Sequence, residues 1–142
     1  MKKLILALMF FATPALAASD FVMHRDPGCG CCEQPSAQVR AAFGRNVRII
    51  DDANRAAFDV RLGVPASLSG CHTAIIDGMT FEGHVPIADM KRVLTTKPRG
   101  VRGLAVAGMP LGSPGMEAPG QRAASFNVMA FGAGGTFVYA RH

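Results

Sequence analysis

The sequence is poor in aromatic residues: it has no tryptophan, one tyrosine and 7% aromatic residues over 142 positions. A surface that binds nucleic acid usually combines a basic stripe with stacking rings. Here the arginines are scattered along the chain, so we expect no nucleic-acid partner. Long apolar runs are scarce as well, since no segment after residue 17 approaches the about 20 apolar residues that a membrane span needs. We therefore expect no membrane span in the mature protein.

The first 17 residues have the pattern of a secretory signal peptide. Lys2 and Lys3 form a basic start, residues 4–12 are an apolar run too short for a membrane span, and small residues stand at Ala15 and Ala17. We predict cleavage after Ala17, which lowers the formal net charge from +5 to +3 because two lysines are removed. Residues 18–142 are then one exported domain in an oxidising compartment, where unprotected thiols tend to pair. A retained membrane anchor is the weaker alternative.

Hydrophobic patterning up to Leu94 predicts four strands and three helices in a single α/β domain. The expected strands are residues 20–24, 47–50, 73–76 and 79–82, and the expected helices are residues 31–43, 54–62 and 87–94. Asp77 and Gly78, between the last two strands, favour a tight turn and hence a β-hairpin. The resulting order βαβαββα is the order of a thioredoxin-like domain.

The chain after Lys97 has a different pattern. Residues 98–125 hold four prolines and six glycines, which predicts a long loop with one strand-like segment at Leu104–Ala107. Residues 126–131 and 136–140 flank a glycine-rich turn and are expected to form a C-terminal β-hairpin. Met109 and Met116 lie in the loop, where we interpret them as apolar plugs rather than as thioether ligands of a soft metal ion.

Three of the four cysteines, Cys29, Cys31 and Cys32, lie within four residues. Cys29 and Cys32 have the C-x-x-C spacing of a redox pair at a predicted strand-to-helix junction, where backbone N–H groups stabilise a thiolate. Cys71 directly precedes the third expected strand, a position that faces the C-x-x-C turn in a thioredoxin-like fold. All four thiols are therefore expected to meet, although 38 residues separate Cys32 from Cys71.

This cysteine cluster has competing interpretations. A structural zinc site is disfavoured, because three ligands from four consecutive residues would crowd one tetrahedral ion. Cu(I) accepts low coordination numbers and prefers soft sulfur ligands, and a thiolate can bridge two ions in a small cluster. The alternative is two disulfides, for example Cys29–Cys32 with Cys31–Cys71, in an exported protein with an even number of cysteines. We favour metal binding over purely structural bridges.

The histidines are weaker candidates than the cysteines. His72 adjoins Cys71 and is counted among the expected metal ligands. His24 and His84 could also face the cluster, but a single histidine is more often a hydrogen-bonded structural residue. His142, the last residue, is expected to be a tail.

Four motifs resemble the CopG-like periplasmic proteins, a family known as domain of unknown function 411 and distinct from the ribbon-helix-helix repressors that share the name. The motifs are CGCC at 29–32, CHTAIIDG at 71–78, EGHVP at 82–86 and GMPLGSPGME at 108–117. The resemblance covers nearly all of the mature chain. It implies a thioredoxin-like periplasmic domain, a place among copper-resistance genes, and a role in shifting copper between Cu(I) and Cu(II). Carried over by position, the implied copper ligands are Cys29, Cys31, Cys32 and Cys71.

Our leading hypothesis is a periplasmic copper-binding protein of copper resistance that holds several Cu(I) ions per chain. Other periplasmic copper-resistance proteins are its expected partners. The second hypothesis is a thiol–disulfide oxidoreductase without a physiological metal, in which Cys29 and Cys32 are the catalytic pair. The third is an exported domain whose cysteines form only structural disulfides.

Overall fold

The computed structural model describes residues 21–142, so the predicted signal peptide at residues 1–17 lies outside the described residues. The strands are β1 (Phe21–Arg25), β2 (Val47–Asp51), β3 (His72–Ile76), β4 (Met79–Glu82), β5 (Gly103–Ala105), β6 (Asn127–Gly132) and β7 (Gly135–Arg141). The helices are α1 (Glu33–Phe43), α2 (Arg55–Leu62) and α3 (Ile87–Thr96), with short 3₁₀ turns at Gly30–Cys32 and Ala66–Leu68. Within residues 21–142, no helix is long and apolar enough to cross a membrane.

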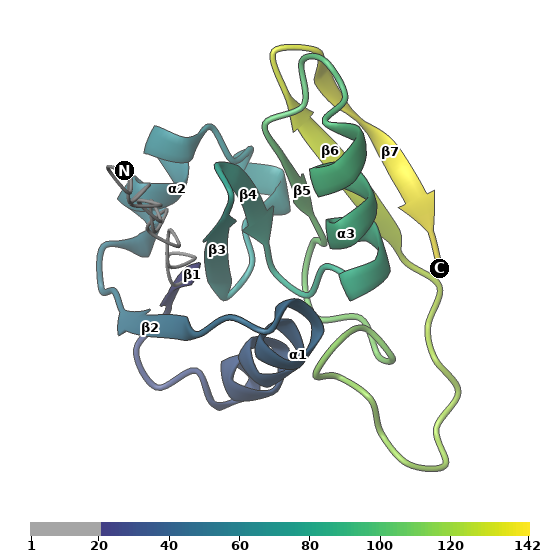
Figure 1. The fold of residues 1–142 in the computed structure, drawn as a ribbon. Coiled ribbons are helices and arrows are strands. Elements are labelled where there is room, and N and C mark those ends of the chain that lie inside the picture. Colours follow the sequence, from purple (N-terminus) through teal and green to yellow (C-terminus); the bar gives the residue numbers. More distant parts are fainter. Residues whose placement is uncertain (1–20) are drawn as a thin grey trace, which may run out of the picture.

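The seven strands of residues 21–142 form one mixed sheet in the order β2-β1-β3-β4-β5-β6-β7 (Figure 1). β1 pairs parallel with β2 and antiparallel with β3. Arg25, the last residue of β1, lies opposite His72, the first residue of β3. The chain that leaves β1 is therefore beside the chain that enters β3, which places the cysteine-rich turn next to Cys71.

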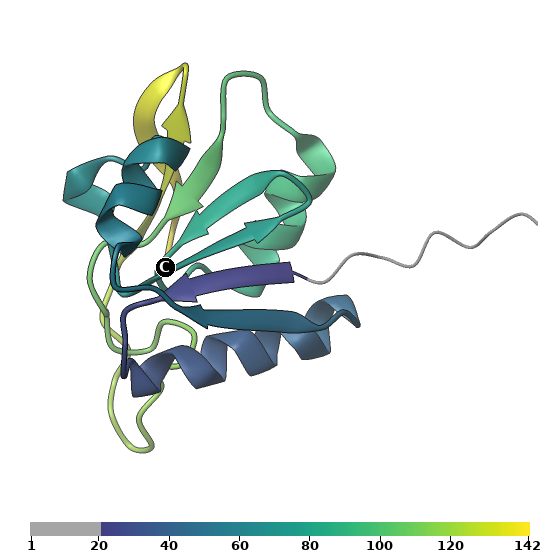
Figure 2. The same ribbon diagram turned by 90° about the vertical axis from the view of Figure 1, so that its left-hand side faces the viewer.

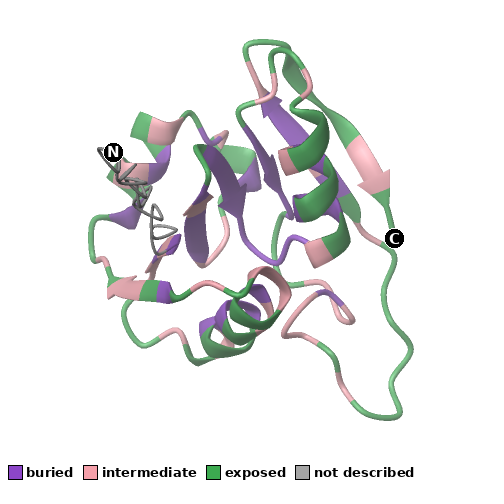
Figure 3. Cartoon of the chain, viewed as in Figure 1, coloured by how far each residue is buried: buried purple, intermediate pink, exposed green. Residues whose placement is uncertain are grey.

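Helices cover both faces of the sheet, as the two perpendicular views show (Figures 1 and 2). The main core lies between the sheet and helices α1 and α3, and it includes Phe21, Met23, Val39, Phe81, Met90 and Leu104. A smaller core on the opposite face, beside the end of α2, is built from Val64, Leu68, Ala105 and Phe131. Buried residues are concentrated in the central strands, whereas most of β7 is exposed at the edge of the sheet (Figure 3).

The structure confirms a mixed α/β fold. From β1 to α3 the elements follow as strand, helix, strand, helix, strand, strand and helix. The hairpin between β3 and β4 turns at Asp77 and Gly78, whose φ angles of 49° and 79° are the positive values that a tight primed turn requires. The assignment of the whole arrangement to the thioredoxin-like class remains a prediction.

The loop between β5 and β6 corrects one expectation about the methionines. Met109 is 55% exposed, so its interpretation as an apolar plug is wrong, while Met116 is half-buried. The loop is held by Ser113, which is fully buried and whose hydroxyl donates to the Pro110 carbonyl oxygen at 2.7 Å. Hydrogen bonds therefore organise this segment more than methionine packing does.

The C-terminal segment corrects a second expectation. His142 is not a free tail, because its Nε2 lies 2.7 Å from a carboxylate oxygen of Asp89 on α3. Its backbone also pairs with Phe126 in both directions, at 2.9 and 3.0 Å. The hairpin of β6 and β7, whose position the sequence left open, joins the sheet beside β5 and is tied to α3 at its end.

Candidate metal centre

The cysteine-rich turn begins directly after β1 and ends in α1. Gly28 has a φ of 78°, a value that residues with a side chain rarely adopt, and it turns the chain back toward the sheet. The Cys29 backbone N–H donates to the Asp26 carbonyl at 3.1 Å, and the 3₁₀ turn Gly30–Cys32 leads into the helix. This tight path places three cysteine side chains within one turn of chain.

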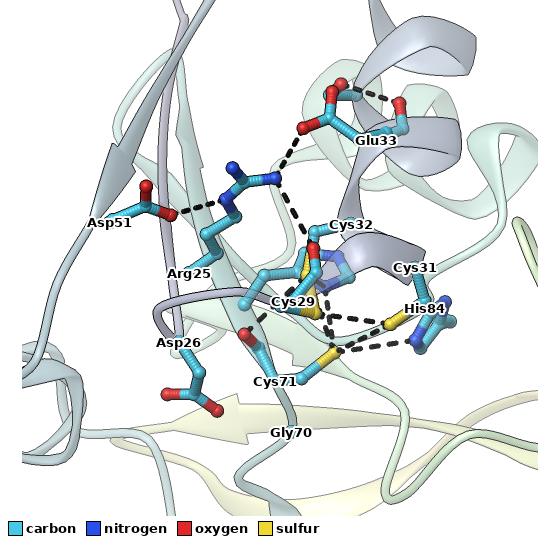
Figure 4. Close-up of a disulfide and its surroundings, with 12 residues drawn as sticks. Arg25, Asp26, Cys29, Cys31, Cys32, Glu33, Asp51, Gly70, Cys71 and His84 are labelled. Atoms are coloured by element: carbon cyan, nitrogen blue, oxygen red, sulfur yellow. Dashed lines mark hydrogen bonds and ion pairs between the residues drawn. A yellow bond between two sulfur atoms is a disulfide. The ribbon is translucent and has the colours of Figure 1, made fainter.

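Cys71 reaches the same place from the start of β3. Its carbonyl oxygen accepts a hydrogen bond from the Asp26 backbone at 3.0 Å, so the two segments are joined through the main chain. Its sulfur lies 3.8 Å from Cys31 Sγ and 3.7 Å from Cys32 Sγ (Figure 4). The four sulfur atoms lie within 4.8 Å of one another. The expected meeting of Cys71 with the cysteine-rich turn is confirmed.

Two of the four cysteines are oxidised in the structure. Cys29 and Cys32 form a disulfide, whereas Cys31 and Cys71 are free thiols. The structure thus has the first bridge of the two-disulfide alternative and lacks the second. Cys31 Sγ lies only 3.2 Å from Cys29 Sγ, so the free thiols contact the disulfide.

Two histidines border the sulfur atoms. His72 Nδ1 lies 3.4 Å from Cys71 Sγ and 3.6 Å from Cys32 Sγ. His84 Nε2 lies 3.7 Å from Cys71 Sγ, which makes His84 a stronger candidate than its sequence position indicated. His24 is not part of the cluster, because its ring bonds Asp52 at 2.8 Å and stacks on Phe58. The motif EGHVP contained the only sequence signal for His84.

Burial controls the protonation of this pocket. It raises the pKa of the Cys71 thiol from 9.0 to about 12, and the neighbouring Cys31 acts in the same direction. Burial also lowers the pKa of His72 from 6.5 to about 3, and electrostatic repulsion from the neighbouring His84 lowers it further. At neutral pH the Cys71 thiol and the His72 imidazole are therefore both neutral. A metal ion that binds Cys71 would displace the proton of its thiol.

A buried ionic network supports the backbone before Cys71, and sequence reasoning missed it. Arg55 of α2 has a side chain only 7% exposed and contacts Asp59 at 2.7 Å and Glu82 at 3.1 Å. It also donates to the Gly70 carbonyl oxygen, while the Gly70 N–H donates to Glu82 Oε1 at 2.5 Å. Both the N–H and the carbonyl oxygen of Gly70 are thereby held by side chains of this network. The only sequence signals were a charged residue at the end of a mostly apolar strand and an i, i+4 pair on a short helix.

A second, exposed network holds the other side of the site. Arg25 bonds Asp51 at 2.6 Å and Glu33 at 2.5 Å, and it also donates to the Cys29 carbonyl oxygen at 3.3 Å (Figure 4). Both carboxylates are more than half exposed, so these ion pairs contribute less than the buried ones. Their role is to orient the turn rather than to stabilise the whole fold.

The donor set fits a soft metal ion. Four sulfur atoms and two imidazole nitrogens converge here. They come from the cysteine-rich turn, from the start of β3 and from His84, the second residue after β4. Sulfur ligands favour Cu(I) and Zn(II) over hard cations such as Mg²⁺ or Ca²⁺. In the reduced state all four thiols could serve as ligands, whereas the disulfide leaves two.

Comparison with known proteins adds independent information. The family model described as "Protein of unknown function, DUF411" matches residues 68–116, which contain Cys71, His72 and His84. Two solved structures, named "Copper resistance protein copG- Form 1" and "Copper resistance protein copG- Form 2", are each 40% identical to this chain with a TM-score of 0.76. Each match covers 87% of this chain and 96% or 97% of the solved chain. No curated protein sequence matched.

Proposed function

This chain belongs to the CopG-like DUF411 family, and from that premise we propose that it is an exported copper-binding protein of copper resistance. It binds Cu(I) through the thiolates of Cys29, Cys31, Cys32 and Cys71, with His72 beside them. The observation that carries this proposal is the convergence of four sulfur atoms within 4.8 Å from two distant segments. Residues 1–17 direct its export to the periplasm and are then removed, and other periplasmic copper-resistance proteins are its partners.

The crowding of the sulfur atoms favours several copper ions over one zinc ion. A single tetrahedral ion has four ligand positions, and three thiolates from one short turn are poorly placed to occupy three of them. Cu(I) accepts two or three ligands, and each thiolate can bridge two ions. Four thiolates in this volume can therefore hold a small cluster of Cu(I) ions. The names of the two similar structures, which say copper resistance, support copper as the metal.

The disulfide supports a redox role for Cys29 and Cys32. Two Cu(II) ions accept one electron each from this pair, which gives two Cu(I) ions, one disulfide bond and two released protons. The Cys31 and Cys71 thiols stay reduced and remain beside the new disulfide at 3.2 and 3.7 Å. Copper is the oxidant in this step, so the site can convert Cu(II) to Cu(I) without another cofactor.

A second candidate is a thiol–disulfide oxidoreductase without a physiological metal. The Cys29–Cys32 bridge and the free Cys31 thiol, 3.2 Å from Cys29 Sγ, favour it. This candidate predicts exchange with dithiol substrates and no tight binding of copper. The family relationship to copper resistance proteins places it second.

Cu(I) titration of the protein before and after reduction tests the proposal. The titration uses a chromophoric Cu(I) chelator as competitor, and free thiols are counted in each sample. The reduced protein is expected to bind several Cu(I) ions per chain, and oxidation of Cys29 and Cys32 is expected to lower that number. His24→Gln is the matched control, since His24 lies outside the cluster. Equal copper uptake in both redox states would contradict cysteine ligation.

A further inference from the structure

Formation of the Cys29–Cys32 disulfide does not remove all metal donors from the pocket. Cys31 Sγ, Cys71 Sγ, His72 Nδ1 and His84 Nε2 remain, and each lies beside another member of this group. We propose that the oxidised protein holds one d¹⁰ ion, Zn(II) or Cu(I), in a tetrahedral site made of these two sulfurs and two nitrogens. This inference deepens the proposed function by giving the oxidised state a metal site of its own.

The distances around Cys71 match the edges of such a tetrahedron. With metal–sulfur bonds of about 2.3 Å and metal–nitrogen bonds of about 2.0–2.1 Å, tetrahedral angles give sulfur–sulfur edges of about 3.8 Å and sulfur–nitrogen edges of about 3.6 Å. Cys71 Sγ is 3.8 Å from Cys31 Sγ, 3.4 Å from His72 Nδ1 and 3.7 Å from His84 Nε2. All three edges that meet at Cys71 therefore have the lengths that one central ion would produce.

His84 is oriented as a metal ligand. Its Nδ1 lies 2.8 Å from the Pro114 carbonyl oxygen, which can only accept a hydrogen bond, so Nδ1 carries the proton. In the neutral ring Nε2 then has the free lone pair, and Nε2 is the atom that faces Cys71. Histidines that bind metal commonly donate their other N–H to a backbone carbonyl in this way. The loop anchored by buried Ser113 thus acquires a role, because it fixes the tautomer of His84.

Hydrogen bonds alone satisfy this arrangement only when His72 carries its ring proton on Nδ1 and donates it to sulfur. In the other tautomer of His72, Nδ1 has a free lone pair, as Nε2 of His84 has. The nitrogens of His72 and His84 both face the single sulfur of Cys71, and a thiol has one proton to donate. That proton can serve only one of the two rings at a time. A metal ion bound to the thiolate satisfies both lone pairs at once. The objection that the cysteine-rich turn would crowd a single ion does not apply here, because the turn supplies only Cys31.

The double variant Cys29→Ser/Cys32→Ser isolates this donor set, because it removes the disulfide pair and prevents exchange with the two remaining thiols. The untagged variant is titrated with Zn(II) against a chromophoric chelator and with Co(II) as an optical probe. We expect one ion per chain, tetrahedral Co(II) bands and thiolate-to-cobalt charge transfer. X-ray absorption of the Zn(II) form should give two sulfur and two nitrogen ligands. The wild-type protein with Cys29–Cys32 closed and two free thiols should behave in the same way.

Added substitutions test the individual ligands. Cys31→Ser or His84→Gln in this background should weaken Zn(II) binding at least about tenfold, while His24→Gln leaves it unchanged. Circular dichroism establishes that each variant is folded. X-ray absorption of the Zn(II) form of the double variant identifies the ligands even if the histidine substitutions disturb folding. Absence of Zn(II) and Co(II) binding, or coordination by sulfur alone, would overturn the inference. Its failure is distinct from failure of the proposed function, which is tested by Cu(I) uptake of the fully reduced wild-type protein.

Discussion

Glu82 is fully buried at the end of β4, in a network that has one proton too few if every carboxyl group is charged. The Thr73 hydroxyl lies 2.5 Å from a carboxylate oxygen of Asp59 and 2.6 Å from Glu82 Oε2. A hydroxyl has a single hydrogen and can donate it to only one of these oxygens. Burial raises the pKa of Glu82 from 4.5 to about 7, so Glu82 is the group that carries the second proton. Its other oxygen accepts from Gly70 and Arg55.

Glutamine at this position mimics the protonated acid. The amide oxygen of Glu82→Gln can accept from Gly70 and Arg55, and the amide nitrogen can donate to Thr73. The sign of the pH effect follows from the raised pKa: between pH 4.5 and about 7 the native state binds more protons than the unfolded state, so stability falls as pH rises. The difference between these two pKa values corresponds to about 3 kcal/mol at 1.36 kcal/mol per pH unit. As pH rises through this range, the wild-type protein should lose about this much free energy of unfolding, and Glu82→Gln should not.

Urea unfolding of both proteins at pH 5 and pH 8, with a metal chelator present, measures this effect. The stability of Glu82→Gln relative to wild type should increase by about 2–3 kcal/mol from pH 5 to pH 8. The charge change of buried His72 is common to both proteins and cancels in the difference. Glu33→Gln, on the exposed side of the site, is the matched control and should follow the wild type. If Glu82→Gln had the same pH dependence as wild type, the proton assignment in the network would be wrong.

Other variants test the rest of the site and the sheet. In the reduced protein, Cys71→Ser should lower Cu(I) uptake about as much as Cys32→Ser without loss of circular dichroism signal; full uptake by Cys71→Ser would make it a bystander. Arg55→Met should cost about 3–5 kcal/mol in urea unfolding, because it leaves the buried Asp59 carboxylate without its cation. Arg25→Met should cost less, since its partners are exposed, and equal losses would refute this ranking. Gly103→Ala should destabilise the fold by about 1–3 kcal/mol, because a Cβ there would lie 2.3 Å from a β4 backbone oxygen; unchanged stability would contradict the packing.

Secondary structure near the site could be predicted because local signals agree with the tertiary fold. Gly44 ends α1 in the left-handed conformation, with a φ of 63°, as a glycine after a helix usually does. Pro35 lies in the first turn of α1, where a missing N–H costs little. Predicted β5 was longer than the observed Gly103–Ala105, since a run of small apolar residues does not mark where strand pairing stops.

The candidate site could be predicted in its cysteines and only partly in its histidines. Spacing placed Cys29, Cys31 and Cys32 in one turn, and strand order placed Cys71 beside them. His84 could not be predicted as a ligand as firmly as the cysteines. The orientation of its ring depends on the turn after β4 and on the carbonyl group of Pro114, thirty residues later in the chain. His24 had a comparable sequence context and instead bonds Asp52.

The sequence alone determined the chemistry available at this site: three thiols in one tight turn, a fourth at the start of a strand, and a helix that begins directly after the turn. These features depend on residues close in the chain, where backbone preferences and spacing decide the outcome. Tertiary structure decided which side chains join the thiols, because strand pairing brings the end of β1, the start of β3 and the segment after β4 to the same end of the strands. It also decided the protonation of the surroundings, since Glu82, His72 and Cys71 have shifted pKa values only when the packed chain removes water from them.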